Sequence, residues 1–368
     1  MEYLKYCQTY IKGSGLAPDS PPIRKFLAKF FILPCFLIIA LSIYKLRDSN
    51  SDIFLVIDVL ECVASYTQLT IRKYIIYNHG KLMEEIISDC ENLWSFDMFG
   101  PELGKNFDQK MRNTWTVVKS LITCGFVTFI LMCVSATTSK ENPLPFTCWV
   151  PNFAFATELL FLLQFLLLME LLYDVMAMDG FFLLVCMDIQ IQFKMMKKML
   201  HSIQFGVTSE EESWDKLVEL VKQHNKMLKL HQKLNRVFSR YFLVQYAMTV
   251  GSMTVQAYTL KYSEANIETT IKSIVYTISL MLQGASFFFS ASNIEIEAGN
   301  FSKEIYFLNW EDQQDVKIKK HILFMLMKSQ ENLELTGEGM VHVNRRDYLK
   351  MFRLAFTIAT LLDGLSHF

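Results

Sequence analysis

Apolar runs of roughly twenty residues, separated by charged stretches, constrain this chain more than any other feature of its sequence. They cover residues 30–44, 53–77, 115–136, 153–200, 241–260 and 271–291. A helix needs about 20 mostly apolar residues to cross a bilayer, and it satisfies all its backbone hydrogen bonds internally. Because 52% of the residues are hydrophobic and only 20% are charged, the sequence predicts an all-α integral membrane protein.

A seventh segment, Asn344–Phe368, has the composition of a helix but carries a polar stripe. It contains no Pro or Gly before Asp363. At about 100° per residue, one face collects Arg346, Lys350, Arg353, Thr357, Thr360, Leu361 and Gly364. A polar stripe at membrane depth belongs inside a bundle or beside water. Two hypotheses remain open from this segment alone, a pore-lining helix and an ordinary amphipathic C-terminal helix.

The distribution of Lys and Arg predicts the orientation of the seven spans. Only Lys45, Arg47, Lys140, Lys261 and Lys272 fall on one side of the layout, and the other cationic residues fall on the opposite side. The positive-inside rule therefore places the N-terminus in the cytosol and the C-terminus outside the cell. The run from 153 to 200 exceeds a bilayer, so we expect one helix that projects into the cytosol or one broken near Gly180.

Several classes of chemistry find no support in the sequence. There is no Walker loop, GxSxG or HExxH motif, so we expect neither an enzyme nor a cofactor. The 36 Lys and Arg balance 37 Asp and Glu, which gives no electrostatic case for a nucleic-acid partner. His224 and His231 lie seven residues apart, which is not a zinc spacing, so we interpret them as core or surface histidines and predict no metal site.

Acidic residues inside the spans are costly and often functional. Asp58, Glu61 and Glu158 are the candidates. Each acid has either a role in contacting a ligand or a purely structural role. In the structural interpretation, Asp58 and Glu61 pair with a neighbour inside the bundle, and Glu158 lies near the outer interface.

Aromatic side chains gather in the outer halves of the spans: Tyr66, Phe126, Phe129, Phe155, Phe161, Phe165 and Tyr276. A cavity among the second, third, fourth and sixth spans would be apolar, with few polar groups such as Thr67 or Thr277. Such a cavity suits a small volatile or lipid-like ligand held by shape and dispersion. Plain helix packing is the competing interpretation.

Several ordered motifs resemble those of the insect odorant receptor family. They are Gln283 and Asn293, the segment IYFLNWEDQ (Ile305–Gln313), Ser329 with Gln330, the LxLTGxG turn (Leu333–Gly339), Thr360 to Leu362, and the block of His224, Leu234, Asn235 and Phe238. The chain departs from the family pattern at Ser292 and at Thr357 to Ala359. It lacks the TYxxxxQF signature of gustatory receptors and the long insertion of the co-receptor. The resemblance therefore implies an odorant-specific tuning subunit.

The resemblance implies a heterotetrameric, odorant-gated, nonselective cation channel in the plasma membrane of olfactory neuron dendrites. Its partners would be the co-receptor subunit, a small volatile odorant, permeating cations and the lipid bilayer. Four regions follow: a cytosolic tail (1–29), spans one to four with an outer-half pocket (30–205), cytosolic anchor helices with spans five and six (206–340), and a pore-lining seventh span (341–368).

The resemblance also implies which residues carry the function. The odorant pocket would be lined by Val63, Tyr66, Thr67, Ile122, Gly125, Phe129, Phe161, Phe165, Tyr276 and Leu280. The pore and its gate would be formed by Thr357, Thr360, Leu361, Gly364 and Leu365. A homomeric gustatory-type channel and a metabotropic seven-helix receptor are the alternatives. The basic residues Arg346, Lys350 and Arg353 would lie at the inner mouth of a cation pore.

Overall fold

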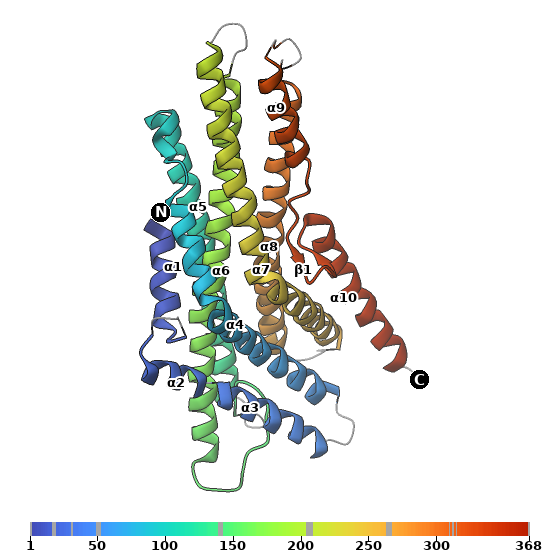
Figure 1. The fold of residues 1–368 in the computed structure, drawn as a ribbon. Helices are drawn as coiled ribbons and strands as arrows, with labels where there is room; N and C mark the ends of the chain where they lie inside the picture. Colours follow the sequence, from blue (N-terminus) through green and yellow to red (C-terminus); the bar gives the residue numbers. More distant parts are fainter. Residues whose placement is uncertain are drawn as a thin grey trace.

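The computed structural model describes residues 2–16, 20–30, 32–48, 53–138, 143–203, 209–262, 267–308, 310, 313 and 315–366. It is an elongated bundle in which long helices run side by side (Figure 1). The long helices are α4 (Ile53–Glu91), α5 (Pro101–Thr138), α6 (Ala156–His201), α7 (Glu210–Tyr262) and α8 (Ile267–Tyr306). The all-α prediction is confirmed. We call the ends inner and outer according to the orientation that the charge distribution predicts.

The long apolar segment forms one unbroken helix, α6, which extends well past the length a bilayer requires. Gly180 lies inside this helix and does not interrupt it. A Cβ atom there would lie 3.2 Å from Val118 and 3.3 Å from Cys7. Gly180 therefore permits a close approach of neighbouring helices, and the alternative of a break at this position is wrong.

The segment predicted as a polar tail contains two helices, α1 (Glu2–Gly13) and α2 (Pro22–Phe30), ahead of α3 (Ile32–Lys45). The apolar face of α1 buries Leu4, Cys7 and Ile11, which recur at helical spacing. Tyr173 on α6 donates a hydrogen bond of 2.8 Å to the carbonyl of Tyr10. The first helix is therefore packed onto the bundle. Two 3-10 turns, η1 (Leu46–Asp48) and η2 (Phe96–Phe99), complete this half.

Length and composition alone single out only part of the seven-span layout. Among the described residues, three helices are long and apolar enough to cross a membrane: Pro101–Thr137, Ala156–His201 and Ser273–Tyr306. A shorter apolar helix is Ile32–Lys45. The remaining spans of the layout carry charged or strongly polar side chains, and the bundle buries several of these, among them Arg72 and Lys73 on α4.

A short hairpin positions the last helix. Strands β1 (Thr336–Gly337) and β2 (Val341–His342) pair antiparallel after α9 (Val316–Ser329). The backbone N–H of Thr336 donates to Asn235 on α7 at 2.9 Å, and a Cβ atom on Gly337 would lie 2.9 Å from the backbone N of Leu243. Glycine is therefore required at position 337, and the hairpin fixes where α10 (Arg345–Ser366) begins.

The two histidines of α7 are core residues. The His224 ring packs against Phe301 with ring centroids 5.4 Å apart. Burial lowers the pKa of His224 and of His231 to about 4, so both side chains are neutral at physiological pH. No group of three metal-ligating side chains occurs in the described part of the chain. The interpretation of these histidines as packing residues agrees with their burial.

Candidate ligand-binding site

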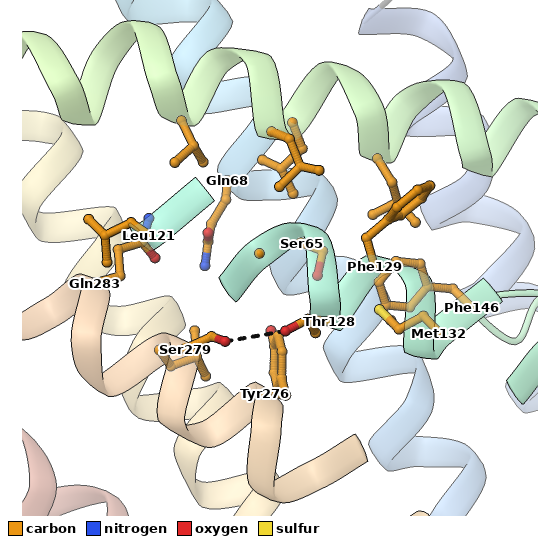
Figure 2. A pocket seen from close by; sticks show the side chains of 16 residues that line it. Ser65, Gln68, Leu121, Thr128, Phe129, Met132, Phe146, Tyr276, Ser279 and Gln283 are labelled. Carbon is orange, nitrogen blue, oxygen red and sulfur yellow. Dashed lines mark hydrogen bonds between the residues drawn. The ribbon is translucent and has the colours of Figure 1, made fainter. Parts of the chain in front are cut away.

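A cavity of about 120 Å³ lies between α4, α5, α6 and α8 (Figure 2). Most of its walls are apolar. Its lining residues are Ser65 and Gln68 of α4; Leu121, Gly125, Thr128, Phe129 and Met132 of α5; Phe146; Leu168, Leu171, Leu172 and Val175 of α6; and Tyr276, Ser279, Leu280 and Gln283 of α8. On each helix these positions recur three, four or seven apart, so one face of each helix forms a wall.

Small side chains open the space between α5 and its neighbours. A Cβ atom on Gly125 would lie 2.8 Å from Cδ2 of Leu172, so any larger residue would push Leu172 aside. Thr128 and Ser279 hold α5 against α8 through a hydroxyl contact of 3.2 Å. Each hydroxyl also donates to a carbonyl of its own helix, that of Cys124 or Val275. These two polar groups are thus satisfied within the protein.

A loop after α5 closes the outer end of the cavity. Gln164 of α6 is fully buried and accepts a hydrogen bond from the N–H of Phe146 at 2.9 Å. Its amide nitrogen donates to the Phe146 carbonyl at 3.0 Å. Thr147 donates to Asp58 of α4 at 3.0 Å. Because Gln164 holds the loop backbone at Phe146 and Asp58 holds the side chain of Thr147, the loop can bring the Phe146 ring into the cavity wall.

A buried ionic network lies at the inner end of the cavity. The guanidinium of Arg72 and the carboxylate of Asp179 lie 3.3 Å apart, with side-chain exposures of 0% and 1%. Arg72 also donates to the Tyr241 hydroxyl at 2.8 Å, and that hydroxyl donates to Asp179 at 3.1 Å. Gln283, which lines the cavity, donates to Asp179 at 2.7 Å. The network joins α4, α6, α7 and α8.

A second buried cation sits beside the first. Lys73 pairs with Asp174 of α6 at 3.2 Å and also with Glu170. Buried charges are tolerated only when paired and hydrogen-bonded. Adjacent cations on α4 therefore meet acids that recur every four or five residues along α6, which fixes the register between the two helices.

The last helix packs against the bundle by one face only. Tyr348, Met351 and Ala355 are buried against α7 and α8. Most of the opposite surface of α10 is open in the single chain, and Leu361 is 62% exposed. Figure 1 shows α10 inclined at one edge of the bundle, with its C-terminal end pointing away.

The family model described as 7tm odorant receptor matches residues 53–356, which include the cavity, the buried network and the first half of α10. The chain belongs to the insect odorant receptor family. Related curated sequences include odorant receptor 59b of Drosophila melanogaster, which is 25% identical over 154 residues, covering 42% of this chain and 38% of the relative. Odorant receptor 82a of the same species is 21% identical over 238 residues, covering 62% of this chain and 59% of the relative.

The fold of this odorant receptor chain is that of a solved family member. The insect olfactory receptor OR5 from Machilis hrabei in complex with eugenol superimposes with a TM-score of 0.81 at 14% identity, covering 99% of this chain and 98% of that one. A second structure of the same receptor gives a TM-score of 0.80 at 13% identity, covering 98% of this chain and 97% of that one. These similarities show that the fold is shared over nearly the whole length of both chains. The curated relatives, by contrast, align with this chain over only 38% to 59% of their own length.

Four of the ten residues predicted for the odorant pocket line the cavity of this receptor chain: Gly125, Phe129, Tyr276 and Leu280. The other six lie elsewhere: Val63, Tyr66, Thr67, Ile122, Phe161 and Phe165. On α4, the cavity face holds Ser65 and Gln68, which flank the predicted Tyr66 and Thr67 on either side. A helix turns about 100° per residue, and an error of one residue points a side chain away.

On α6, the residues that line the cavity lie further along the helix than the residues predicted for the pocket. The α6 wall begins at Leu168, seven residues and therefore about 10 Å inward of Phe161. Phe165 stands behind the wall, with its ring centroid 5.1 Å from that of Phe129. The α6 wall of the cavity thus lies further along α6, toward its inner end, than the predicted Phe161 and Phe165.

Residues that the sequence did not single out complete the site. Arg72, Asp179 and Tyr241 come from three helices, and Phe146 comes from a loop. One usable signal was Gln164, a lone amide inside an apolar run of α6. A buried amide must find hydrogen-bond partners, and here they are the backbone groups of the loop.

Two of the three candidate acids of the receptor have hydrogen-bond partners on other segments. Asp58 accepts a hydrogen bond from Thr147, and Glu61 accepts one from Gln256 of α7. Glu158 is exposed in the first turn of α6. None of the three lines the cavity. The two contacts match the structural interpretation of Asp58 and Glu61, and they tie α4 to the outer loop and to α7.

The residues predicted for the pore lie on α10, away from the cavity. Thr357, Thr360, Leu361 and Gly364 are exposed. The side chain of Leu365 lies outside the part of the chain that the structure describes. The face that carries Thr357 and Leu361 is therefore available to other subunits or to water.

The buried network gives a testable prediction about stability. Asp179→Leu leaves the Arg72 guanidinium buried without its counter-ion, which we expect to cost roughly 3–5 kcal/mol. The double variant Arg72→Met/Asp179→Leu removes both charges and should recover most of that loss. The loss of stability is measured by heating the detergent-solubilised receptor and following the yield of monodisperse protein by fluorescence-detected size exclusion.

The control is Glu331→Leu, which breaks the exposed pair between Lys328 and Glu331. Surface pairs contribute little to stability, so this variant should behave like wild type. If Asp179→Leu were as heat-resistant as the control, or if the double variant were no better than the single one, the network would not hold the bundle together.

Proposed function

We propose that the chain is the tuning subunit of an odorant-gated, nonselective cation channel. A small volatile molecule binds in the cavity between α4, α5, α6 and α8 and opens a pore lined by α10. The observation that carries this proposal is the position of α8, which forms one wall of the cavity and packs against α10 with its other face.

The size and walls of the cavity suit a small volatile ligand. An engineered apolar cavity of about 150 Å³ binds benzene, and the cavity here measures about 120 Å³. Its walls are mostly aliphatic and aromatic, so binding energy comes from dispersion and removal of apolar surface from water. The solved receptor with the same fold was determined in complex with eugenol. That complex supports a similar class of ligand for this chain.

Contacts between α8 and α10 provide a route from the cavity to the pore. Tyr348 of α10 donates a hydrogen bond of 2.8 Å to the carbonyl of Met281. A Cβ atom on Gly284 would lie only 3.1 Å from the Tyr348 ring, so the two helices touch closely. Leu280 and Gln283, the residues just before Met281 and Gly284, line the cavity. A ligand that shifts or rotates this part of α8 also moves the surface on which α10 rests.

The mechanism is a population shift between closed and open arrangements. A ligand changes that equilibrium only by binding one arrangement more tightly than the other, by a few kcal/mol for a strong response. Movement of α10 would displace Leu361 from the pore axis and let water enter a hydrophobic constriction. The pore surface comprises Thr357, Thr360, Leu361, Gly364 and Leu365.

The exposed surfaces of the chain support assembly with other subunits, as a heterotetramer with the family's co-receptor in the plasma membrane of the olfactory dendrite. The outward face of α10 combines Leu361, 62% exposed, with polar side chains, and such a face needs other subunits around a water-filled axis. At the inner end, Phe307 at the end of α8 and Phe324 and Met327 on α9 are 73%, 61% and 62% exposed. Exposed apolar patches of this kind mark protein interfaces.

The basic residues at the inner end of α10 are partly neutralised. Lys350 pairs with Asp347 one turn earlier at 2.6 Å. Arg345 donates to Asn293 of α8 at 2.7 Å and lies over the Phe289 ring at 5.5 Å, which turns its charge toward α8. Arg346 and Arg353 are exposed on α10. Acidic groups of other subunits or a wide vestibule would make these charges compatible with cation flow.

The proposal is tested by recording currents from cells that express the chain with the co-receptor while a panel of volatiles is applied. Gly125→Val should raise the half-maximal concentration of the larger agonists by roughly tenfold, because overpacking costs about 1–3 kcal/mol. The smallest agonists should be affected least, since the added methyl groups occupy only part of the cavity.

The matched control for this experiment is Gly251→Val on α7, where an added Cβ atom meets no neighbour within 4 Å. Equal shifts in the two variants, or none in Gly125→Val, would place the ligand elsewhere. Currents from the chain expressed without the co-receptor would favour the homomeric gustatory-type alternative.

The role of α10 is tested separately. Leu361→Ala should raise the current recorded without ligand severalfold, because the smaller side chain weakens a hydrophobic constriction. Leu349→Ala is the control, since Leu349 lies on the same helix and is 59% exposed but sits near its inner end. A basal current unchanged by Leu361→Ala would count against a gating role for this side chain.

A further inference from the structure

The cavity contains one buried amide whose hydrogen-bond donors face its interior. Gln68 of α4 lines the cavity and is 7% exposed. Figure 2 shows its side chain extending from α4 into the space that the four helices enclose. The residue is nine-tenths buried, so water satisfies its polar atoms poorly and any unpaired group there lowers stability.

The neighbouring guanidinium determines which way this amide points. Arg72, one helical turn inward, donates from Nη1 to Oε1 of Gln68 at 3.5 Å. An arginine side chain has donors and no acceptor, so the amide oxygen must face it. The amide nitrogen of Gln68 therefore faces the cavity. Within the described part of the chain, this nitrogen donates a hydrogen bond to no residue.

Other polar groups of the lining are engaged within the protein. The amide nitrogen of Gln283 donates to Asp179 at 2.7 Å. The amide oxygen of Gln283 accepts a hydrogen bond from Gln245 at 3.4 Å. The hydroxyls of Thr128 and Ser279 donate to carbonyls of their own helices at 3.0 and 2.9 Å. Gln68 differs from these three because its oxygen is held by a cation and its N–H groups are left for a ligand.

We propose that the ligands of this chain carry a hydrogen-bond acceptor oxygen that Gln68 receives at the inner end of the cavity, with an apolar remainder toward Phe129. This rests on the function proposed above. The chemical class is a small oxygenated volatile, such as a ketone, ester or ether, of roughly six non-hydrogen atoms, the size of the benzene that a slightly larger cavity holds. A hydrocarbon of the same shape contacts the cavity walls equally well but leaves the buried N–H groups of Gln68 unpaired.

The test compares methyl ketones with their methylene isosteres, in which a =CH₂ group replaces the carbonyl oxygen. Propyl, butyl, pentyl and hexyl members of both series are applied to cells that express the chain with the co-receptor. In the wild-type chain, the best ketone should act at a half-maximal concentration roughly three- to tenfold lower than its isostere, the range of one buried hydrogen bond.

Gln68→Met keeps the volume of the side chain and removes its N–H groups. In this variant, we expect the ratio of the half-maximal concentration of the isostere to that of the ketone to fall to about one. Comparing this ratio between the variant and the wild-type chain cancels differences in how the two compounds reach the cells. Thr70→Val is the matched control. It also replaces a polar side chain by an apolar one of similar size on α4, two residues after Gln68, and Thr70 does not line the cavity. The ratio in the control should remain that of wild type.

Labelling of an extracellular tag reports whether each variant reaches the cell surface. A wild-type ratio near one overturns the inference without any variant, and so does a ratio that Gln68→Met leaves unchanged. Activation by hydrocarbons alone overturns it as well. In these cases the channel function stands. Absence of current to every compound of both series and of a broader volatile panel, with the chain at the surface, removes the proposed function and the inference with it.

Discussion

A buried guanidinium is the constraint on which the rest of this bundle depends. Arg72 is fully enclosed, so the protein must supply its counter-ion and its hydrogen-bond partners, and these come from Asp179 on α6 and Tyr241 on α7. Gln283 of α8 donates a further hydrogen bond to the Asp179 carboxylate. The four helices that meet at this network include three of the four that enclose the cavity. The network therefore sets the inner end of the cavity, and its charge orients the amide of Gln68.

Helix α8 links the cavity to α10 because its opposite faces have different neighbours. Tyr276, Leu280 and Gln283 belong to the cavity, whereas Met281 and Gly284 contact Tyr348 on α10. A packed helix of this kind transmits a rotation or a shift as a unit, since protein interiors are close-packed and do not absorb displacement in empty space. The arrangement gives a physical basis for the proposed coupling, in which a ligand in the cavity changes the position of α10.

The sequence was sufficient to predict the all-α fold and the family, because hydrophobic periodicity and motif order can be read directly from the chain. It also indicated which four helices meet at the cavity, through the family resemblance. All predicted positions on α5 and α8 except Ile122 line the cavity, but those on α4 and α6 do not. The cavity holds Ser65, Gln68 and Leu168, because long-range pairs such as Arg72 with Asp179 decide which faces of α4 and α6 meet. Phe146 reaches the cavity only because Gln164 binds its backbone across 18 residues of chain.

The most direct measurement is a cryo-electron microscopy map of the proposed channel of this chain with the co-receptor, with and without the agonist that acts at the lowest concentration. We expect agonist density between α4, α5, α6 and α8 of this chain, in contact with Phe129, Tyr276 and Leu280. We also expect α8 and α10 to move together between the two maps. Agonist density outside this cavity, or an α10 that moves while α8 stays in place, would contradict the proposed mechanism.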